Sequence, residues 1–233
     1  MNVVITGASR GIGKAIAEQF AAHGHHLFLN ARTESTLLAT AGELRTRFPA
    51  VRVEAMAADL SNKASARLFG EWAIGTAGII DVLVNNTGTF TPGGISTEAD
   101  GALEHMLGTN LFSAYHVTRA VLPHMMAAKS GHIFTMCSIA SLQAYPNGGA
   151  YSISKFALLG FNRNLREELK PHGIKVTSVL PGAVYTDSWN GSGVSEDRIM
   201  KPEDIAQLIY TASQLSYAAT VEEIVVRPQL GDL

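Results

Sequence analysis

Residues 1–24 read MNVVITGASRGIGKAIAEQFAAHG, and this stretch decides the fold. Val3, Val4 and Ile5 form a short β-branched run, which is typical of a buried strand. A glycine-rich stretch follows, and the residues after it have helical periodicity up to Gly24, where glycine favours the end of a helix. A strand, a glycine-rich turn and a helix in this order predict a unit that binds a dinucleotide.

The glycine spacing carries the physical reason for this prediction. Glycines let the backbone approach a pyrophosphate, and the first turn of the next helix offers free N–H groups and the positive end of its dipole. The spacing here is T-G-x-x-x-G-x-G and not G-x-G-x-x-G. The alternative interpretation is that the glycines only shape a tight turn between strand and helix.

Composition and charge narrow the class of protein. Of the 233 residues, 46% are hydrophobic and only 16% are charged, which indicates a sheet buried on both faces or a subunit interface. The formal net charge is −2 without a block of basic residues, so we expect no nucleic acid partner and no membrane partner. The single cysteine, Cys137, fits a reducing compartment. No signal peptide and no apolar run of ~18 residues is visible, so we expect a cytoplasmic protein.

Strand-like and helical segments alternate along the whole chain, without a linker or a change of composition. Further strands are expected at 26–32, 51–57, 82–84, 131–138, 174–182 and 221–228, and the main helices at 34–48, 97–126, 151–169 and 201–213. This alternation predicts one α/β domain over residues 1–233, a doubly wound Rossmann-type fold with a parallel sheet.

The stretch 138–155, SIASLQAYPNGGAYSISK, carries side chains suited to acid–base chemistry. If a helix begins near Tyr151, then Tyr151 and Lys155 share one face, because residues four apart are neighbours. An adjacent ammonium stabilises a phenolate, which makes the phenol usable as an acid near neutral pH. Ser138 can reach the same point as a neutral donor to a substrate oxygen. The alternative is a half-buried tyrosine beside a solvated lysine.

Several motifs resemble those of the short-chain dehydrogenase/reductase family. Thr6–Gly13 (TGASRGIG) is similar to its cofactor loop, Asn85–Gly88 (NNTG) to its Asn-Asn-Ala-Gly motif, and Pro181–Thr186 to its Pro-Gly-x-x-x-Thr element. Ser138 precedes Tyr151 by 13 residues, as in the family. The resemblance covers the whole chain and implies seven strands in the order 3-2-1-4-5-6-7, with the cofactor lying across the switch between strands 1 and 4.

The resemblance also implies a mechanism, the reduction of a ketone by NADPH with a tetrad of Asn110, Ser138, Tyr151 and Lys155. Tyr151 donates the proton, Lys155 favours its phenolate and holds the nicotinamide ribose, and Ser138 hydrogen-bonds the carbonyl oxygen. Asn110 lies in a long apolar helix, where the matching family residue disturbs the helix and links the lysine to solvent through water. The helices around 110–126 and 151–169 resemble the family's dimerisation helices, so we expect a homodimer or a homotetramer.

The end of the second strand points to NADP(H) rather than NAD(H). NAD-binding folds place an acidic residue there to bind the ribose 2′-hydroxyl, whereas Asn30, Ala31 and Arg32 stand here. Arginine binds a phosphate in a bidentate fork, so Arg32 and Arg10 resemble the NADP-preferring members of the family. The alternative is two solvated arginines. The residues predicted to bind the cofactor are Gly7, Ser9, Arg10, Gly11, Ile12, Gly13, Arg32, Asp59, Leu60, Asn86, Gly88, Tyr151, Lys155, Pro181, Gly182, Val184 and Thr186.

Three positions carry narrower expectations. Asp59 is implied to bond the adenine amino group, although an isolated aspartate there more often caps the following helix. Thr87 replaces a small apolar residue of the family motif, and we expect this change to be tolerated; the alternative is that it perturbs the packing behind the cofactor. Asn85 and Cys137 are expected to be structural, and we predict no metal site.

The segment at about 187–200 is polar and contains glycine, which predicts a mobile lid over the substrate. The residues predicted to contact the substrate are Ser138, Tyr145, Tyr151 and Trp189. Trp189 either stacks on a flat substrate or only packs the lid down. With Leu142 and Pro146 nearby, the pocket favours an apolar or aromatic ketone.

Several functions remain open on the same fold. The C-terminal third looks closer to bacterial sepiapterin-reductase-like members, which would reduce a pterin or a diketone. A 3-oxoacyl reductase is the alternative within the family. An NAD-dependent alcohol dehydrogenase is disfavoured by Arg32, and a non-catalytic scaffold is disfavoured by the complete tetrad.

Overall fold

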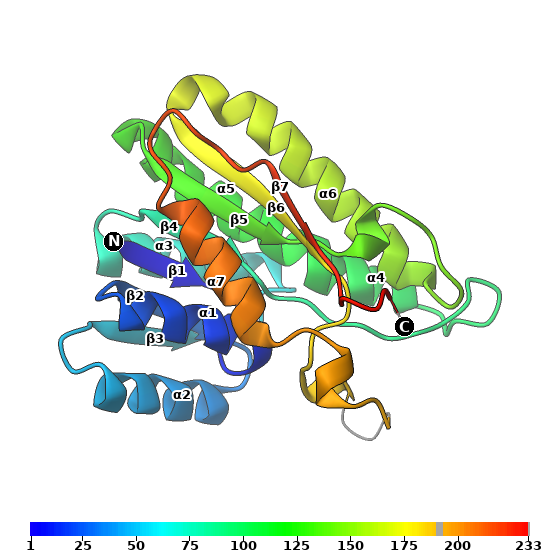
Figure 1. Cartoon of the computed structure of the whole chain (residues 1–233). Helices are drawn as coiled ribbons and strands as arrows, with labels where there is room; N and C mark the ends of the chain where they lie inside the picture. Colours follow the sequence, from blue (N-terminus) through cyan, green and yellow to red (C-terminus); the bar gives the residue numbers. More distant parts are fainter. Residues whose placement is uncertain (190–192, 233) are drawn as a thin grey trace.

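The computed structural model describes residues 1–189 and 193–232, and its centre is one sheet of seven parallel strands (Figure 1). The strands are β1 (Asn2–Ile5), β2 (His26–Ala31), β3 (Val53–Ala57), β4 (Val82–Asn85), β5 (Gly131–Met136), β6 (Ile174–Pro181) and β7 (Glu223–Val226). Their order is β3-β2-β1-β4-β5-β6-β7. The doubly wound fold and the strand order predicted from the sequence are therefore confirmed.

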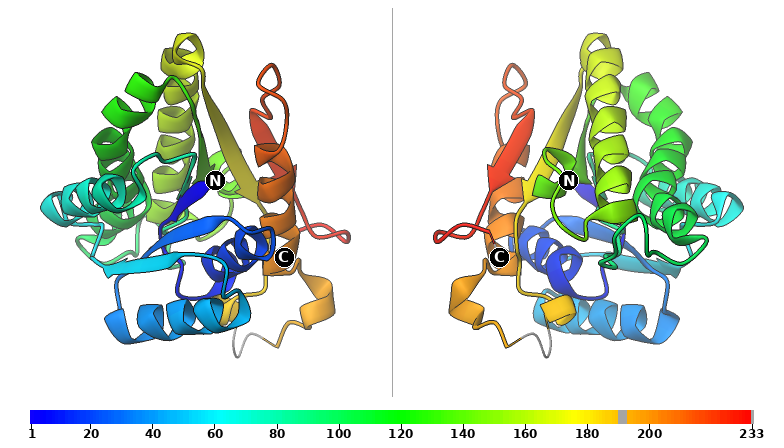
Figure 2. Two further views of the ribbon diagram at one scale, coloured as in Figure 1. Left: turned by 90° about the vertical axis from the view of Figure 1, so that its left-hand side faces the viewer. Right: turned by 90° about the vertical axis from the view of Figure 1, so that its right-hand side faces the viewer.

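Helices cover both faces of the sheet, which gives three layers (Figure 2). One face carries α1 (Gly11–Ala22), α2 (Glu34–Arg47) and α7 (Pro202–Ser213), and the other carries α3 (Lys63–Ala77), α5 (Ser113–Ala128) and α6 (Gly149–Leu169). Successive strand residues point to opposite faces, so Val3 and Ile5 join the core under α1 while Val4 joins the core under α3. This is why the three buried positions of β1, Val3, Val4 and Ile5, are all apolar.

Several element boundaries differ from the sequence-based expectations. The long helix starts with α4 (Ala102–Met106) and not at residue 97, because Gly101, at φ +86, turns the chain sharply into it. A π-helical segment, Leu107–Phe112, then separates α4 from α5. The strands expected at 51–57, 131–138 and 221–228 are shorter at one or both ends, because β-ladder pairing extends only over the observed spans.

None of the helices within residues 1–189 and 193–232 is both long enough and apolar enough to cross a bilayer.

The sheet has a switch point between β1 and β4. β1 pairs with β2 on one side and with β4 on the other, so the chain winds outward in both directions from here. In open α/β sheets ligands bind beyond the carboxyl ends of the strands at such a point.

Candidate active site

A cleft of about 1010 Å³ opens at the carboxyl ends of the strands. Every residue that we predicted to bind cofactor or substrate lines this cleft. Three of the four predicted catalytic residues, Ser138, Tyr151 and Lys155, line it as well. The fourth, Asn110, is fully buried and hydrogen-bonds Thr89 in the cleft wall.

The glycine-rich loop is shaped to receive a phosphate. Gly7 and Gly11 have φ angles of +63° and +54°, a region that favours glycine. A Cβ on Gly13 would overlap the carbonyl oxygen of Gly7 and the amide of Asn86. Asn86 Nδ2 donates to the carbonyl oxygens of Thr6 and Gly7, each at 3.0 Å, and so ties the loop to the end of β4. The N-terminus of α1 therefore faces the cleft across a bare backbone, which fits a pyrophosphate.

The end of β2 presents arginine rather than a carboxylate to the cleft. Asn30 is buried, and its Nδ2 donates to the carbonyl oxygens of Met56 at 3.1 Å and Ala58 at 3.2 Å, so its amide holds β2 against β3. Arg32 is exposed and lines the cleft. Arg10 also lines it, and its Nη1 lies 2.8 Å from Asp187 Oδ2 in an exposed ion pair. Both arginines thus border the cleft, and Arg10 is paired with Asp187 in the segment that was predicted to form a lid.

Asp59 lines the cleft and does not cap the helix that follows it. Its Oδ1 accepts hydrogen bonds from the Ser61 hydroxyl at 2.7 Å and the Ser61 N–H at 3.0 Å. The hydrogen bond from the Ser61 hydroxyl is the main reason why the pKa of Asp59 lies below its ordinary value. Asn62 caps α3 instead, accepting from the N–H groups of Ala64 and Ser65. The capping alternative for Asp59 is therefore wrong.

The predicted acid–base pair lies in the first part of α6. Lys155 Nζ is 5.8 Å from the centroid of the Tyr151 ring, one turn further along the helix. Lys155 is buried, and Nζ donates to the carbonyl oxygen of Met136 at 2.7 Å, which orients the ammonium from the end of β5. A cation fixed beside a phenol stabilises the phenolate.

Ser138 lies two residues beyond β5 and begins a short 3₁₀-helix, Ile139–Ser141. Its Oγ accepts a hydrogen bond from the Ala140 N–H at 3.1 Å. A hydroxyl that accepts in this way keeps its own hydrogen for donation. The local turn therefore holds the Ser138 hydroxyl as a donor at the cleft surface.

Asn110 lies in the π-helical segment, and its side chain hydrogen-bonds the backbone of the loop after β4. Its Oδ1 accepts from the Thr89 N–H at 2.7 Å, and its Nδ2 donates to the Thr89 carbonyl oxygen at 3.0 Å and to Ser154 Oγ at 2.9 Å. A Cβ on Gly88 would lie 3.4 Å from Asn110 Oδ1 and 3.7 Å from Lys155 Nζ. Both polar atoms thus approach one point. π-helical turns are frequent at functional sites.

Four further residues from the sequence analysis are described by their burial and their hydrogen bonds. Burial raises the pKa of Tyr145 to about 12, so its hydroxyl stays protonated at neutral pH. Burial likewise raises the pKa of Cys137 to about 12 and keeps it a thiol. Asn85 is structural, since its Nδ2 donates to Thr118 Oγ1 at 2.9 Å. The Thr87 hydroxyl is buried and has no hydrogen-bond partner among the described residues.

The predicted lid is only partly covered by the structure. Trp189 ends a short 3₁₀-helix, Asp187–Trp189, and lines the cleft. Residues 190–192 of the lid lie outside the described residues.

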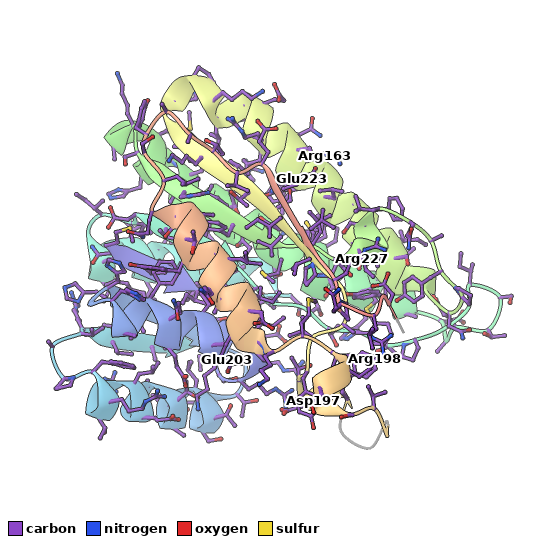
Figure 3. All side chains as sticks on the ribbon, in the orientation of Figure 1. Arg163, Asp197, Arg198, Glu203, Glu223 and Arg227 are labelled. Carbon is purple, nitrogen blue, oxygen red and sulfur yellow. The ribbon has the colours of Figure 1, made fainter. Side chains whose placement is uncertain are left out.

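The structure also brings residues to the cleft that sequence reasoning missed. Phe90 packs edge-on against Tyr151, with ring centroids 4.8 Å apart at an interplanar angle of 78°. Its signal in the sequence is an aromatic residue two positions after Gly88. Asp232 has no such signal, because its place depends on a folded-back tail. Arg198 donates to three tail carbonyls, and Arg227 pairs with Asp232 at 2.9 Å. Both arginines are labelled in Figure 3.

Comparisons with known proteins agree with this geometry. The family model described as short chain dehydrogenase matches residues 1–196. Sepiapterin reductase from Chlorobaculum tepidum is 34% identical over 242 residues, which cover 99% of this chain and 97% of that protein. A monensin polyketide synthase putative ketoacyl reductase from Streptomyces virginiae is 35% identical over 253 residues, with 98% and 96% covered.

A solved structure supports the same relationship. A metagenomic short-chain oxidoreductase in complex with NADP superposes with a TM-score of 0.85 at 32% identity, covering 98% of this chain and 97% of that one. The glycine-rich loop, the order of the strands and the similarity to known proteins all indicate the same family. The chain therefore belongs to the short-chain dehydrogenase family and is an oxidoreductase of that family.

Proposed function

We propose that this protein is a cytoplasmic reductase that converts a ketone to an alcohol, with NADPH as hydride donor and Tyr151 as proton donor. The observation that carries the proposal is the meeting of Ser138, Tyr151 and Lys155 in the same cleft as the glycine loop and Arg32. One end of the cleft offers groups for a phosphorylated dinucleotide, and the other offers groups for a carbonyl oxygen.

The cofactor half of the cleft has the donors that NADPH requires. The N–H groups at the start of α1 would hold the pyrophosphate. Arg32 and Arg10 would hold the 2′-phosphate, and Asp59 would accept from the adenine amino group. Lys155 would hold the nicotinamide ribose. The chemistry that bound NADPH would supply is hydride donation to the carbonyl carbon.

The catalytic half supplies one proton and orients the carbonyl. Ser138 donates a hydrogen bond to the carbonyl oxygen and stabilises the negative charge that develops there. Tyr151 transfers its phenolic proton to that oxygen, which completes the alcohol. Lys155 stabilises the phenolate that remains, and Asn110 and Lys155 return a proton to it from solvent through water.

The substrate that fits this cleft best is a flat ketone or diketone, including a pterin side-chain ketone. Phe90, Tyr145 and Trp189 all line the cleft, and aromatic side chains bind planar groups by stacking or edge contact. The similarity to a sepiapterin reductase supports this choice. The similarity to a putative ketoacyl reductase makes a 3-oxoacyl thioester the second candidate.

We also propose that the chain acts as a homodimer or a homotetramer. Phe112, at the entry to α5, and Ile153 and Phe156 on α6 are between 41% and 45% exposed. Exposed aromatic and aliphatic side chains on neighbouring helices are typical of subunit interfaces. Light scattering coupled to gel filtration measures the mass, and a monomer of 24.8 kDa would contradict this proposal.

The first test of the function is a fluorescence titration with NADPH and, separately, with NADH. Trp189 lines the cleft, so its emission reports binding. A lower dissociation constant for NADPH followed by turnover of aromatic ketones, diketones or pterins is the expected result. Preference for NADH would favour alcohol oxidation instead. Binding of neither would favour a non-catalytic scaffold.

A further inference from the structure

We propose that Glu98 is a positioning residue for the reaction, because its carboxylate caps helix α6 and so holds Tyr151 in place. This inference rests on the proposed function, in which Tyr151 is the proton donor. Glu98 does not reach the substrate. It acts through the backbone of the helix that carries Tyr151 and Lys155.

Helix α6 starts without a cap of its own. Its N-cap residue, Gly148, has no side chain, and its first four residues, GAYS, include no acidic residue. The first N–H groups of a helix lack partners within the helix, and the positive end of its dipole lies there. Tyr151 belongs to this first turn, so disorder at the helix start would move the phenol directly.

Glu98 supplies the missing cap from a distant part of the chain. Its Oε1 accepts a hydrogen bond from the Ala150 N–H at 2.7 Å, across a sequence separation of 52 residues. A carboxylate in this place both satisfies an N–H group and opposes the helix dipole. Charge-assisted hydrogen bonds of this kind are shorter and stronger than neutral ones.

Two glycines make room for the Glu98 side chain. Gly149 has a φ angle of +26°, and a Cβ there would overlap Glu98 Oε1. A Cβ on Gly93 would lie 2.8 Å from Glu98 Cγ. The Gly93 N–H also donates to the Asn147 carbonyl oxygen at 3.0 Å, which joins the two loops. The partly buried Glu98 side chain therefore lies between the loop after β4 and the start of α6.

The loop that carries Glu98 touches Tyr151 at a second point. Phe90, in the same loop, packs edge-on against the Tyr151 ring. Asn110 holds the start of this loop through Thr89. One loop thus holds Tyr151 through its ring at Phe90 and through its helix at Glu98, and releasing Glu98 would loosen both contacts.

The test compares Glu98→Ala and Glu98→Gln, the second of which keeps an acceptor oxygen without the charge. The matched control is Asp81→Ala. Asp81 also accepts a backbone hydrogen bond, from the Asn2 N–H at 2.6 Å, but at the amino ends of β1 and β4, away from the cleft. Each variant is measured for hydrogen exchange in the peptide covering residues 148–155 and for kcat and KM with NADPH and 1-phenyl-1,2-propanedione.

In Glu98→Ala we expect faster exchange in this peptide and a kcat lower by about ten- to a hundredfold, since small misplacements of reacting groups have effects of that size. The KM for NADPH should stay within about twofold, because Lys155, one turn further along α6, is also held by the Met136 carbonyl oxygen. Glu98→Gln should restore most of the kcat. Asp81→Ala should lose thermal stability while both its kcat and its exchange in this peptide remain as in the wild type.

Three results would overturn the proposal. Unchanged exchange in Glu98→Ala would show that Glu98 does not cap α6. Faster exchange with a wild-type kcat in Glu98→Ala would show that the cap does not position Tyr151. An equal fall of kcat in Asp81→Ala would show that the loss of activity comes from general destabilisation of the fold. If the wild type reduces no carbonyl compound, the proposed function fails, and the exchange comparison alone then decides the capping role of Glu98.

Discussion

Lowering the pH should weaken this fold through His132, a buried histidine on β5. His132 is 5% exposed, and its ring stacks on Phe134 with centroids 3.9 Å apart. Its Nε2 lies 2.7 Å from Thr177 Oγ1, whose own hydrogen is donated to the Val221 carbonyl oxygen. Thr177 therefore accepts from His132, which sets the neutral tautomer with hydrogen on Nε2. Among the described residues, Nδ1 has no hydrogen-bond partner.

Protonation of His132 would place a charge on this enclosed Nδ1. Burial, followed by the positive charges of Lys175 and Arg166, lowers the pKa of His132 to about 3 from the model-compound value of 6.5. Below pH 6.5 the unfolded chain binds a proton here that the folded chain does not, so stability falls as the pH falls toward 3. At 1.36 kcal/mol per pH unit, the loss between pH 7.5 and pH 5 is ~2 kcal/mol.

The assay is urea unfolding at pH 7.5 and pH 5.0 for the wild type, His132→Gln and a control, His172→Gln. Glutamine keeps an N–H donor toward Thr177 but cannot be protonated. We expect His132→Gln to be less stable at pH 7.5, because the ring packing is lost. Its further loss on acidification should be smaller than that of the wild type by ~2 kcal/mol.

The control separates this effect from the other histidines. His172 lies outside β5, in the turn before β6, so His172→Gln keeps His132 and should keep the loss of stability that His132 causes between the two pH values. Burial also lowers the pKa values of His25 and His116, and their contribution is common to all three proteins. If His132→Gln loses as much stability on acidification as the wild type, then His132 is not the group responsible and the argument fails.

Three further predictions concern the cleft. Tyr151→Phe should lower kcat by about a hundredfold or more, the usual contribution of general acid catalysis, while NADPH still binds in a fluorescence titration; retained turnover would remove Tyr151 as the acid. Arg32→Ala should raise the dissociation constant of NADPH by about tenfold or more and leave that of NADH within about twofold, because only a 2′-phosphate offers a charged partner; equal loss for both would contradict the assignment. Asp187→Asn should tighten NADPH by up to about fivefold, since it frees Arg10 from an exposed ion pair of modest strength; isothermal titration showing weaker binding would mean that Asp187 helps to hold the cofactor.

Local patterns were enough to predict much of the fold and the proximity of Tyr151 and Lys155. The β-branched run at 3–5 and the glycines after it predict a strand and a turn from the conformational preferences of neighbouring residues alone. Tyr151 and Lys155 are one helical turn apart, so their proximity follows from the period of the helix. Strand ends were less well predicted, because a strand ends where its partner strand stops pairing.

Contacts between distant segments were beyond these patterns. The resemblance implied a disturbed helix at Asn110. The hydrogen bonds between the Asn110 side chain and the Thr89 backbone form only because the π-helical segment packs against the loop after β4. Arg10 looked like a solvated or phosphate-binding residue, and the fold adds Asp187 beside it, 177 positions along the chain. Asp232 reaches the cleft only because the tail folds back under Arg198 and Arg227.

The amino-acid sequence alone thus determined the order of strands and helices, the phosphate-binding loop and the Tyr-x-x-x-Lys pair, since each depends on residues a few positions apart. The tertiary structure alone decided the contacts of Asn110 with Thr89 and of Glu98 with the Ala150 N–H, and it alone placed Phe90 and Asp232 at the cleft. Hydrophobic periodicity specifies which face of an element is buried, but not which polar side chain from another element meets it there. Which polar side chains meet depends on how the loops run and how the helices pack on the sheet, and both are defined only in the folded protein.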